Sequence, residues 1–299
     1  MRNNAFRGTG VALVTPFAND YSVDFRSLEA IVEHVIAGGA DFLVVLGTTS
    51  EAPALSVDEK NAVLHSVIRV NKRRLPIMLG MGGNNTAALL QQIKSFDFAG
   101  VDGILTVVPY YNKPNQSGIK AHFTAVADVA PVPVVLYNVP GRVGVNMQVS
   151  TCLELAQHPN ICAVKEASGN LSQIMEILRD KPAGFDVLSG DDEITQPMMS
   201  LGAVGVISVA ANAYTKVFSS MMQAMADGRI DKALSLHYAM LKMNKLIFAD
   251  GNPAGIKTLL NVMGLCDNLL RLPLVSANDI VQDDIKTEWN DNLKRFIYN

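Results

Sequence analysis

Along most of this chain, short runs of apolar residues alternate with longer stretches in which apolar residues recur at helical spacing. The runs are rich in Val, Ile and Leu and lack polar alternation, which is typical of strands covered on both faces in a parallel sheet. They are GVALVT (10–15), FLVVLG (42–47), PIMLG (76–80), GILTVVP (103–109), VPVVLYN (132–138), ICAVK (161–165), FDVLSG (185–190) and VGVISV (204–209). Successive runs end between 19 residues (190 to 209) and 33 residues (47 to 80) apart, so the chain contains eight strand–helix units.

Eight such units of roughly 30 residues predict a closed (β/α)₈ TIM barrel of the α/β class. An open doubly wound sheet is the alternative, and the absence of any irregular interruption between the units argues against it. The 299 residues fit one barrel of about 250 residues with an appendage. We expect the barrel over 1–226 and C-terminal helices packed on it over 227–299, with helical stretches at 230–247 and 253–263.

Composition and charge narrow the class of protein. Apolar residues make up 49% of the chain and charged residues 18%, which supports a large core, and the net charge of −3 argues against nucleic acid or a membrane surface as a partner. The start MRNNAFRGTG contains no apolar segment of a secretory signal, and no run approaches the roughly 18 residues of a membrane helix. Three widely spaced cysteines, Cys152, Cys162 and Cys266, predict reduced thiols in a cytoplasmic protein.

Polar residues follow directly after several of the runs, and TIM barrels carry their functional groups at these carboxyl ends of strands. Gly47-Thr48-Thr49 offers two hydroxyls and backbone N–H groups that can hold a small carboxylate, although the same triplet also makes ordinary turns. Arg142 follows Pro140-Gly141 at a loop tip. Its guanidinium can bind a second carboxylate in bidentate geometry, or it can be a solvated surface charge.

Lys165 is the sharpest chemical feature of the sequence. It follows the apolar residues ICAV, so a partly desolvated amine at the barrel mouth is expected, and such an amine can attack a ketone. A structural lysine paired with a buried carboxylate, or a lysine that binds phosphate, is the alternative. Tyr137 stands next to the end of the neighbouring run and can transfer protons during imine formation, or can simply pack the top of the barrel. Glu166 alternates to the other face of the strand.

No metal site is expected. The five histidines show no metal-ligand spacing. Asp191, Asp192 and Glu193 could bind a divalent cation, but they stand at a predicted helix start, where acidic residues favour capping.

Six ordered blocks of sequence resemble the dihydrodipicolinate synthase/N-acetylneuraminate lyase superfamily. The blocks are GTTSE (47–51), TVVPYYNKP (106–114), YNVPGR (137–142), VKEASGN (164–170), LSGDD (188–192) and GVISVAANA (205–213). The resemblance runs over nearly the whole chain. It implies a lysine-dependent class I aldolase that forms a Schiff base with pyruvate and needs no metal or organic cofactor, since the imine is itself the electron sink.

The resemblance also assigns roles to individual residues. Lys165 matches the imine-forming lysine, and Tyr137 matches the tyrosine that relays protons to it. Thr48 matches a hydroxyl that links Tyr137 to a second tyrosine. Tyr111 matches that second tyrosine, which in this family reaches in from a neighbouring subunit, so a homodimer or homotetramer is implied. Thr49 matches the pyruvate carboxylate site.

The branch of the superfamily depends on Arg142. Gly190 and Ile207 match backbone positions that line the imine pocket. Arg142 matches the arginine with which synthases hold the carboxylate of L-aspartate-4-semialdehyde. The implied reaction condenses that aldehyde with pyruvate and opens the diaminopimelate route to lysine. A pyruvate-dependent sugar-acid aldolase or dehydratase, such as an N-acetylneuraminate lyase-like enzyme, is the alternative. A non-catalytic barrel that binds a keto acid is disfavoured because every residue of the proton relay is present.

The chain departs from the family pattern at Ser50, at Val143 and at the lysine feedback site. Many members carry a threonine where Val143 stands, so one hydroxyl near the entrance is missing. Ser50 stands where the family usually has glycine, and if that position requires a positive φ we expect strain of about 1 kcal/mol. At the family's lysine feedback site, Lys60 and Ala88 replace a histidine and a glutamate, although Asn84 and Tyr110 are retained. Because Ala88 offers no carboxylate to the ligand's ammonium group, we predict weak or absent inhibition by L-lysine.

Overall fold

The computed structural model describes residues 5–298, and its eight strands form a closed parallel barrel in chain order. The predicted (β/α)₈ class is therefore confirmed. The strands are β1 (Gly8–Ala12), β2 (Phe42–Val45), β3 (Ile77–Gly80), β4 (Gly103–Val107), β5 (Val134–Asn138), β6 (Ile161–Glu166), β7 (Asp186–Ser189) and β8 (Gly205–Ser208). Among the described residues two compact units are present: one holds residues 5–7 and Pro76–Ile207, and the other holds Gly8–Leu75 and residues 208–298.

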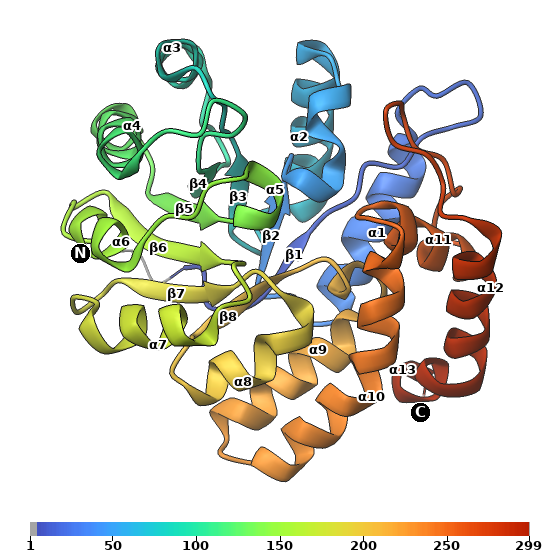
Figure 1. The fold of residues 1–299 in the computed structure, drawn as a ribbon. Coiled ribbons are helices and arrows are strands. Elements are labelled where there is room, and N and C mark those ends of the chain that lie inside the picture. Colours follow the sequence, from blue (N-terminus) through green and yellow to red (C-terminus); the bar gives the residue numbers. More distant parts are fainter. Residues whose placement is uncertain (1–4, 299) are drawn as a thin grey trace. The chain divides into compact units, whose positions relative to one another are not determined.

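The unit around Pro76–Ile207 carries β3 to β7 as consecutive parallel neighbours. Its helices are α3 (Thr86–Ser95), α4 (Gln116–Val129), α5 (Pro140–Val143), α6 (Val149–Leu155), α7 (Leu171–Asp180) and α8 (Thr195–Ser200). Asn85, Asn115 and Asn170 start α3, α4 and α7, because each side chain accepts a hydrogen bond from a backbone N–H of the first turn. Helices α3, α4, α6 and α7 each contact the next of the four, as Figure 1 shows.

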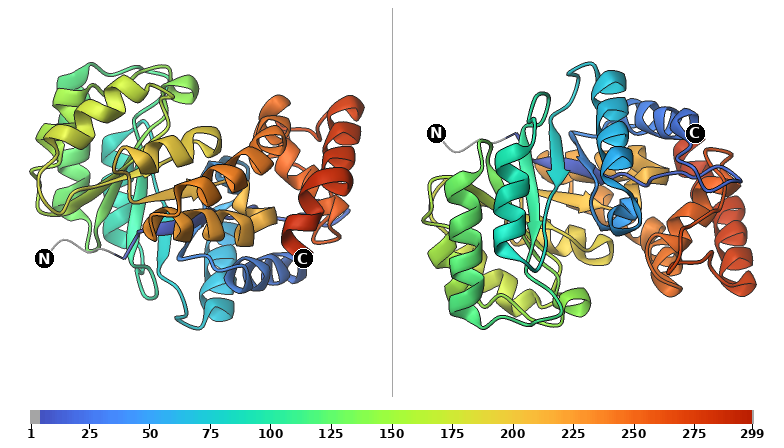
Figure 2. Two further views of the ribbon diagram at one scale, coloured as in Figure 1. Left: turned by 90° about the horizontal axis from the view of Figure 1, so that it is seen from below. Right: turned by 90° about the horizontal axis from the view of Figure 1, so that it is seen from above.

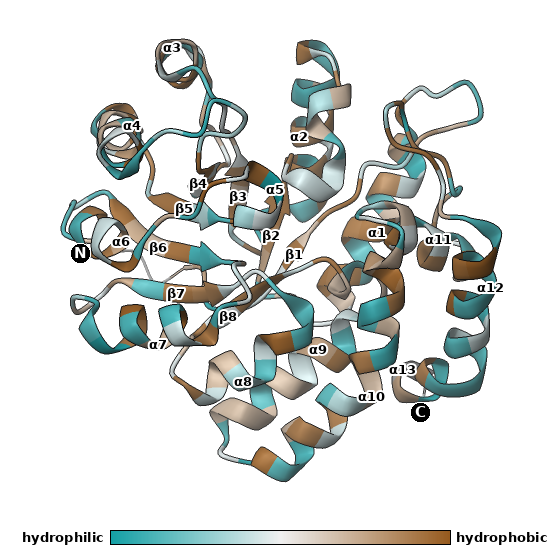
Figure 3. Cartoon of the chain, viewed as in Figure 1, coloured by the Kyte–Doolittle hydropathy of each residue, from teal (hydrophilic) through white to brown (hydrophobic). Residues whose placement is uncertain are grey.

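Strand β6 illustrates how an apolar run forms a buried strand that carries charged side chains at its carboxyl end. Its six residues are all buried, and the apolar stretch gives way to Lys165 and Glu166 at the carboxyl end. In Figure 3 the strand is accordingly brown along its length and teal towards its tip. Burial of the Val and Ile side chains on both faces fixes the strand, so the two charged residues at its end are held on rigid backbone.

The unit around Gly8–Leu75 and residues 208–298 carries β1, β2 and the helices that follow the last strand. Its helices are α1 (Phe25–Ala37), α2 (Val57–Asn71), α9 (Ala211–Ala226), α10 (Ile230–Ala249), α11 (Ala254–Val262), α12 (Asp279–Glu288) and α13 (Lys294–Tyr298). Helix α9 packs on β1, and α10 contacts α9, α11 and α12. Figure 2 shows these C-terminal helices, in orange to red, gathered together in both views. The predicted stretches at 230–247 and 253–263 correspond to α10 and α11.

One strand lies earlier in the chain than its apolar run predicts. Strand β1 ends at Ala12, whereas the run continues to Thr15. The reason is a side chain: the N–H of Val14 donates to Oδ1 of Asn212 at 3.2 Å rather than to a neighbouring strand. None of the helices in the described part of the chain is both long and apolar enough to span a membrane.

Candidate active site

Lys165 lies at the carboxyl end of β6, and only 6% of it is exposed. Its stem passes directly over Gly190, where an added Cβ would stand 2.8 Å from Cε of Lys165 and 3.0 Å from Cγ. Tyr137 is its cross-strand neighbour on β5, and Nζ of Lys165 lies 4.3 Å from the centre of the Tyr137 ring. The structure thus brings together the predicted amine and the predicted proton donor, with Gly190 leaving room for the amine's stem.

The carboxylate next to Lys165 in sequence serves a different purpose. Glu166 is fully buried and accepts hydrogen bonds from Asn138, Ser168 and Gln173. Strand alternation turns it away from the face that carries the Lys165 amine, as predicted. Glu166 is therefore not the carboxylate that an ordinary structural lysine would pair with.

Arg142 and Tyr111 occupy exposed segments of the same unit. Arg142 stands on the short helix α5, which begins with Pro140 and is closed by Gly144 at φ 77°. Tyr111 is 88% exposed and adopts φ 71°, a conformation that costs a bulky residue energy. An aromatic ring held outward in this way is available to a second subunit. Ile207, by contrast, is buried on β8.

The Gly47-Thr48-Thr49 segment lies in the other unit, where Thr48–Ser50 forms the short 3-10 helix η1. Thr49 is buried, and its hydroxyl accepts a hydrogen bond from Nδ2 of Asn252 at 3.1 Å. Ser50 donates through its hydroxyl to the carbonyl of Gly47 at 2.7 Å. Strain at Ser50 was expected only if that position required a positive φ. The structure places the positive φ one residue later, on Glu51 at 54°, so the condition is not met.

Glu51 explains how this loop is held. Its side chain is fully buried and forms an ion pair with Lys257, whose Nζ lies 2.5 Å from Oε1 of Glu51. The other carboxylate oxygen accepts from the backbone N–H of Arg271 at 3.0 Å. Burial lowers the pKa of Lys257, and the Glu51 charge opposes that effect. The sequence reasoning missed Asn252 and Lys257 as supports of the loop, because more than 200 residues separate them from it.

The acidic cluster after β7 has the capping role expected of it. Asp191 accepts a hydrogen bond from the backbone N–H of Glu193 at 3.0 Å and so starts the short helix Asp192–Ile194. Among the described residues there is no group of three or more His, Cys, Asp or Glu that could hold a metal ion.

A buried lysine beside a tyrosine, at the carboxyl ends of neighbouring strands in a parallel barrel, is an arrangement that can serve a lysine-dependent aldolase. The comparisons with known proteins agree with this class. The model of the Dihydrodipicolinate synthetase family matches residues 5–294, and the chain belongs to this family.

Individual relatives resemble the chain over nearly its full length. A 4-hydroxy-tetrahydrodipicolinate synthase of Phocaeicola vulgatus is 50% identical, over 97% of this chain and 98% of its own. The synthase of Parabacteroides distasonis is 49% identical, over 94% of this chain and 95% of its own. A solved dihydrodipicolinate synthase of Thermotoga maritima matches with a TM-score of 0.94 at 33% identity, covering 96% of this chain and 99% of its own.

Proposed function

We propose that this chain is a 4-hydroxy-tetrahydrodipicolinate synthase, a lyase that condenses pyruvate with L-aspartate-4-semialdehyde through a Schiff base on Lys165. The observation that carries the proposal is the pairing of the buried Lys165 amine with the Tyr137 ring at 4.3 Å, over a glycine that leaves the amine's stem unobstructed. The names of the relatives support the same synthase. The reaction belongs to the lysine and diaminopimelate route.

The chemistry follows from the amine. Neutral Lys165 attacks the ketone carbon of pyruvate, and loss of water from the carbinolamine gives the imine. Loss of a proton from the pyruvate methyl group then gives an enamine, whose carbon attacks the aldehyde carbon of the second substrate. The aldehyde oxygen takes up a proton, and attack of the substrate's own amine on the imine carbon releases Lys165 and closes the ring. Tyr137 is the group placed to donate and accept these protons.

The two substrates carry carboxylates that need separate partners. Thr49 and the backbone of its loop are proposed to hold the pyruvate carboxylate, supported by the burial of that loop and its hydrogen bond to Asn252. Arg142 is proposed to hold the carboxylate of the aldehyde, since an exposed guanidinium matches a carboxylate in bidentate geometry. Thr48 and Tyr111 complete the proposed proton relay, and Gly190 and Ile207 are proposed to line the imine pocket.

The exposed Tyr111 supports a proposal about assembly. We infer that the enzyme works as a homodimer or homotetramer in which Tyr111 of one subunit serves its neighbour, and that it acts in the cytoplasm. One similar structure is described as the first monomeric variant of dihydrodipicolinate synthase.

Trapping tests the mechanism directly. The protein is incubated with pyruvate and borohydride, and its intact mass and modified peptide are then determined. A pyruvate-derived adduct on Lys165 that is missing from the Lys165→Ala variant is the expected result. A folded protein that gives no adduct would overturn the assignment. Turnover with L-aspartate-4-semialdehyde but not with 2-keto-3-deoxy acids then separates the synthase from a sugar-acid aldolase.

A further inference from the structure

A second pair of residues lies directly behind the catalytic pair. Asn138 follows Tyr137 on β5, Glu166 follows Lys165 on β6, and the two are partners in the strand register. Both are fully buried. Because side chains alternate along a strand, Asn138 and Glu166 point to the opposite side from Tyr137 and Lys165. The proposed reaction uses the side chains on one face of these strand ends, Tyr137 and Lys165. It assigns no role to Asn138 and Glu166 on the opposite face.

Glu166 sits in a pocket built from neutral donors. Nδ2 of Asn138 lies 3.1 Å from each of its oxygens, the backbone N–H of Ser168 donates at 2.8 Å, and Nε2 of Gln173 donates at 3.3 Å. Burial raises the pKa of Glu166, and these hydrogen bonds offset part of the rise. Since each of these three hydrogen-bond partners is a donor, the site fits a group that only accepts, which is a carboxylate and not an amide.

The same donors hold the chain segment that carries Arg142. Residues 139–147, here called the Arg142 arm, leave β5 after Asn138 and return to it. The N–H of Met147 donates to Oδ1 of Asn138 at 3.0 Å, and Nδ2 of Asn138 donates to Oδ1 of Asn146 at 2.8 Å. Nδ2 of Asn146 in turn donates to Oε1 of Gln173 at 2.7 Å. The returning end of the arm is thereby attached to β5 and α7.

We infer that Asn138, Asn146, Glu166 and Gln173 form a clasp that sets the position of Arg142 relative to Lys165, with Glu166 as its buried acceptor. Glu166 is then a positioning residue for the second substrate, acting through the arm. This inference rests on the proposed function, because it takes Arg142 as the group that holds the aldehyde's carboxylate.

The location of the clasp predicts which step it affects. Imine formation needs Lys165 and Tyr137, whose side chains stand on the other face of the strands from the side chains of the clasp. Arg142 lies between the two ends of the arm, and one of those ends is fixed by the clasp. Loosening the clasp should therefore weaken binding of the aldehyde and leave the capture of pyruvate intact.

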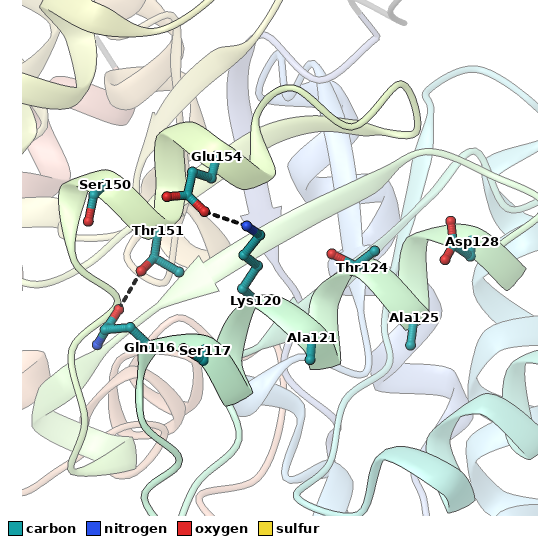
Figure 4. A pocket seen from close by; sticks show the side chains of 10 residues that line it. All are labelled: Gln116, Ser117, Lys120, Ala121, Thr124, Ala125, Asp128, Ser150, Thr151 and Glu154. Atoms are coloured by element: carbon teal, nitrogen blue, oxygen red, sulfur yellow. Dashed lines mark hydrogen bonds and ion pairs between the residues drawn. The ribbon is translucent and has the colours of Figure 1, made fainter.

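The first variant is Glu166→Gln, which turns one acceptor oxygen into an amide nitrogen facing N–H donors. We expect the KM for L-aspartate-4-semialdehyde to rise about tenfold or more, since a displacement of about 1 Å can cost 100-fold, while borohydride trapping of pyruvate on Lys165 is unchanged. The matched control is Glu154→Gln. Glu154 is an exposed carboxylate on α6 that pairs with Lys120 of α4 at 2.6 Å, as Figure 4 shows, and its loss should leave both readouts at the wild-type level.

A second variant keeps the test sharp if Glu166→Gln fails to fold. Asn146 is only half-buried, so Asn146→Ala opens the arm side of the clasp without creating a buried unpaired charge. In an otherwise wild-type protein, Asn146→Ala should raise the KM for L-aspartate-4-semialdehyde. In an Arg142→Ala background it should change this KM little, because the arm no longer carries the guanidinium.

The results separate the inference from the function on which it rests. If folded Asn146→Ala keeps the wild-type KM for the aldehyde, or if its effect is undiminished in the Arg142→Ala background, the clasp does not position Arg142. A fall in kcat at unchanged KM would also overturn it. If wild-type protein itself fails to trap pyruvate, the proposed function is what fails.

Discussion

At the scale of single residues, Gly190 shows how little space the site leaves. A Cβ at this position would stand 2.8 Å from both Cε of Lys165 and Cβ of Ala167. Gly190→Ala should therefore displace the amine and lower kcat/KM for pyruvate by about 10- to 100-fold, with a stability cost of about 1–3 kcal/mol from overpacking. Steady-state kinetics and urea unfolding measure the two effects.

The control for this substitution is Gly83→Ala. A Cβ added at Gly83 would meet nothing within 4 Å, so kinetics and stability should both stay close to the wild type. Equal activity of the Gly190→Ala and Gly83→Ala variants would mean that the stem of Lys165 moves freely and that the glycine has no role in placing the amine.

Glu59 predicts an acid-sensitive contribution to stability. A hydrogen bond from Arg271 is the largest favourable effect on its carboxylate, and the pKa of Glu59 is lowered from 4.5 to about 2. Between these values the unfolded chain binds more protons than the folded one, so this stabilisation is present above pH 4.5 and is lost as the pH falls towards 2.

The Glu59→Gln variant removes the titrating group but keeps an oxygen that can accept from the backbone of Ser56 in the capping box of α2. Urea midpoints measured from about pH 5 to pH 3 should consequently fall less steeply in Glu59→Gln than in the wild type. Identical slopes would show that the pair with Arg271 contributes nothing to folding.

At the scale of elements, the apolar runs identified every strand because periodicity and branching are local properties of the sequence. The pairing of Tyr137 with Lys165 was also within reach, since neighbouring strands of a barrel bring their carboxyl ends together. Side-chain contacts between segments that are distant in the sequence could not be predicted. Neither the hydrogen bond from Val14 to Asn212 at the end of β1 nor the support of the Thr49 loop by Asn252 leaves any local signal in the sequence.

The ion pair between the Thr49 loop and α11 gives a prediction at this scale. Lys257 and Glu51 are both fully buried in side chain, so Lys257→Met leaves an uncompensated buried carboxylate. We expect the free energy of unfolding to fall by about 3–5 kcal/mol. The double variant Lys257→Met with Glu51→Gln should recover part of this loss, because no unpaired charge remains.

A surface pair provides the comparison. Lys120 and Glu154 are about half exposed, so Lys120→Met should cost less than about 1 kcal/mol in the same urea experiment. If Lys257→Met lowers the free energy of unfolding no more than Lys120→Met does, then Glu51 is protonated or pairs with another group in that variant. The ion pair would then not hold the loop.

At the scale of the whole molecule, the exposed Tyr111 decides whether one chain is a complete enzyme. If Tyr111 serves a neighbouring subunit, then Tyr111→Phe and Lys165→Ala should each be nearly inactive alone and should complement each other when mixed and reassembled. In a mixed dimer, the subunit that keeps Lys165 receives an intact Tyr111 from its partner. If equal amounts of the two variants reassemble at random, half of the dimers are mixed, and each mixed dimer has one active site out of two. Roughly a quarter of the wild-type turnover is therefore expected.

The controls are the Tyr111→Phe and Lys165→Ala variants, each taken alone through the same dissociation and reassembly. Activity that stays at the level of the single variants after mixing would place Tyr111 in its own subunit's site, and full activity of Tyr111→Phe alone would remove it from the proton relay. Complementation would instead mean that assembly completes the active site, so that dissociating the subunits should abolish turnover while leaving the fold of each chain intact.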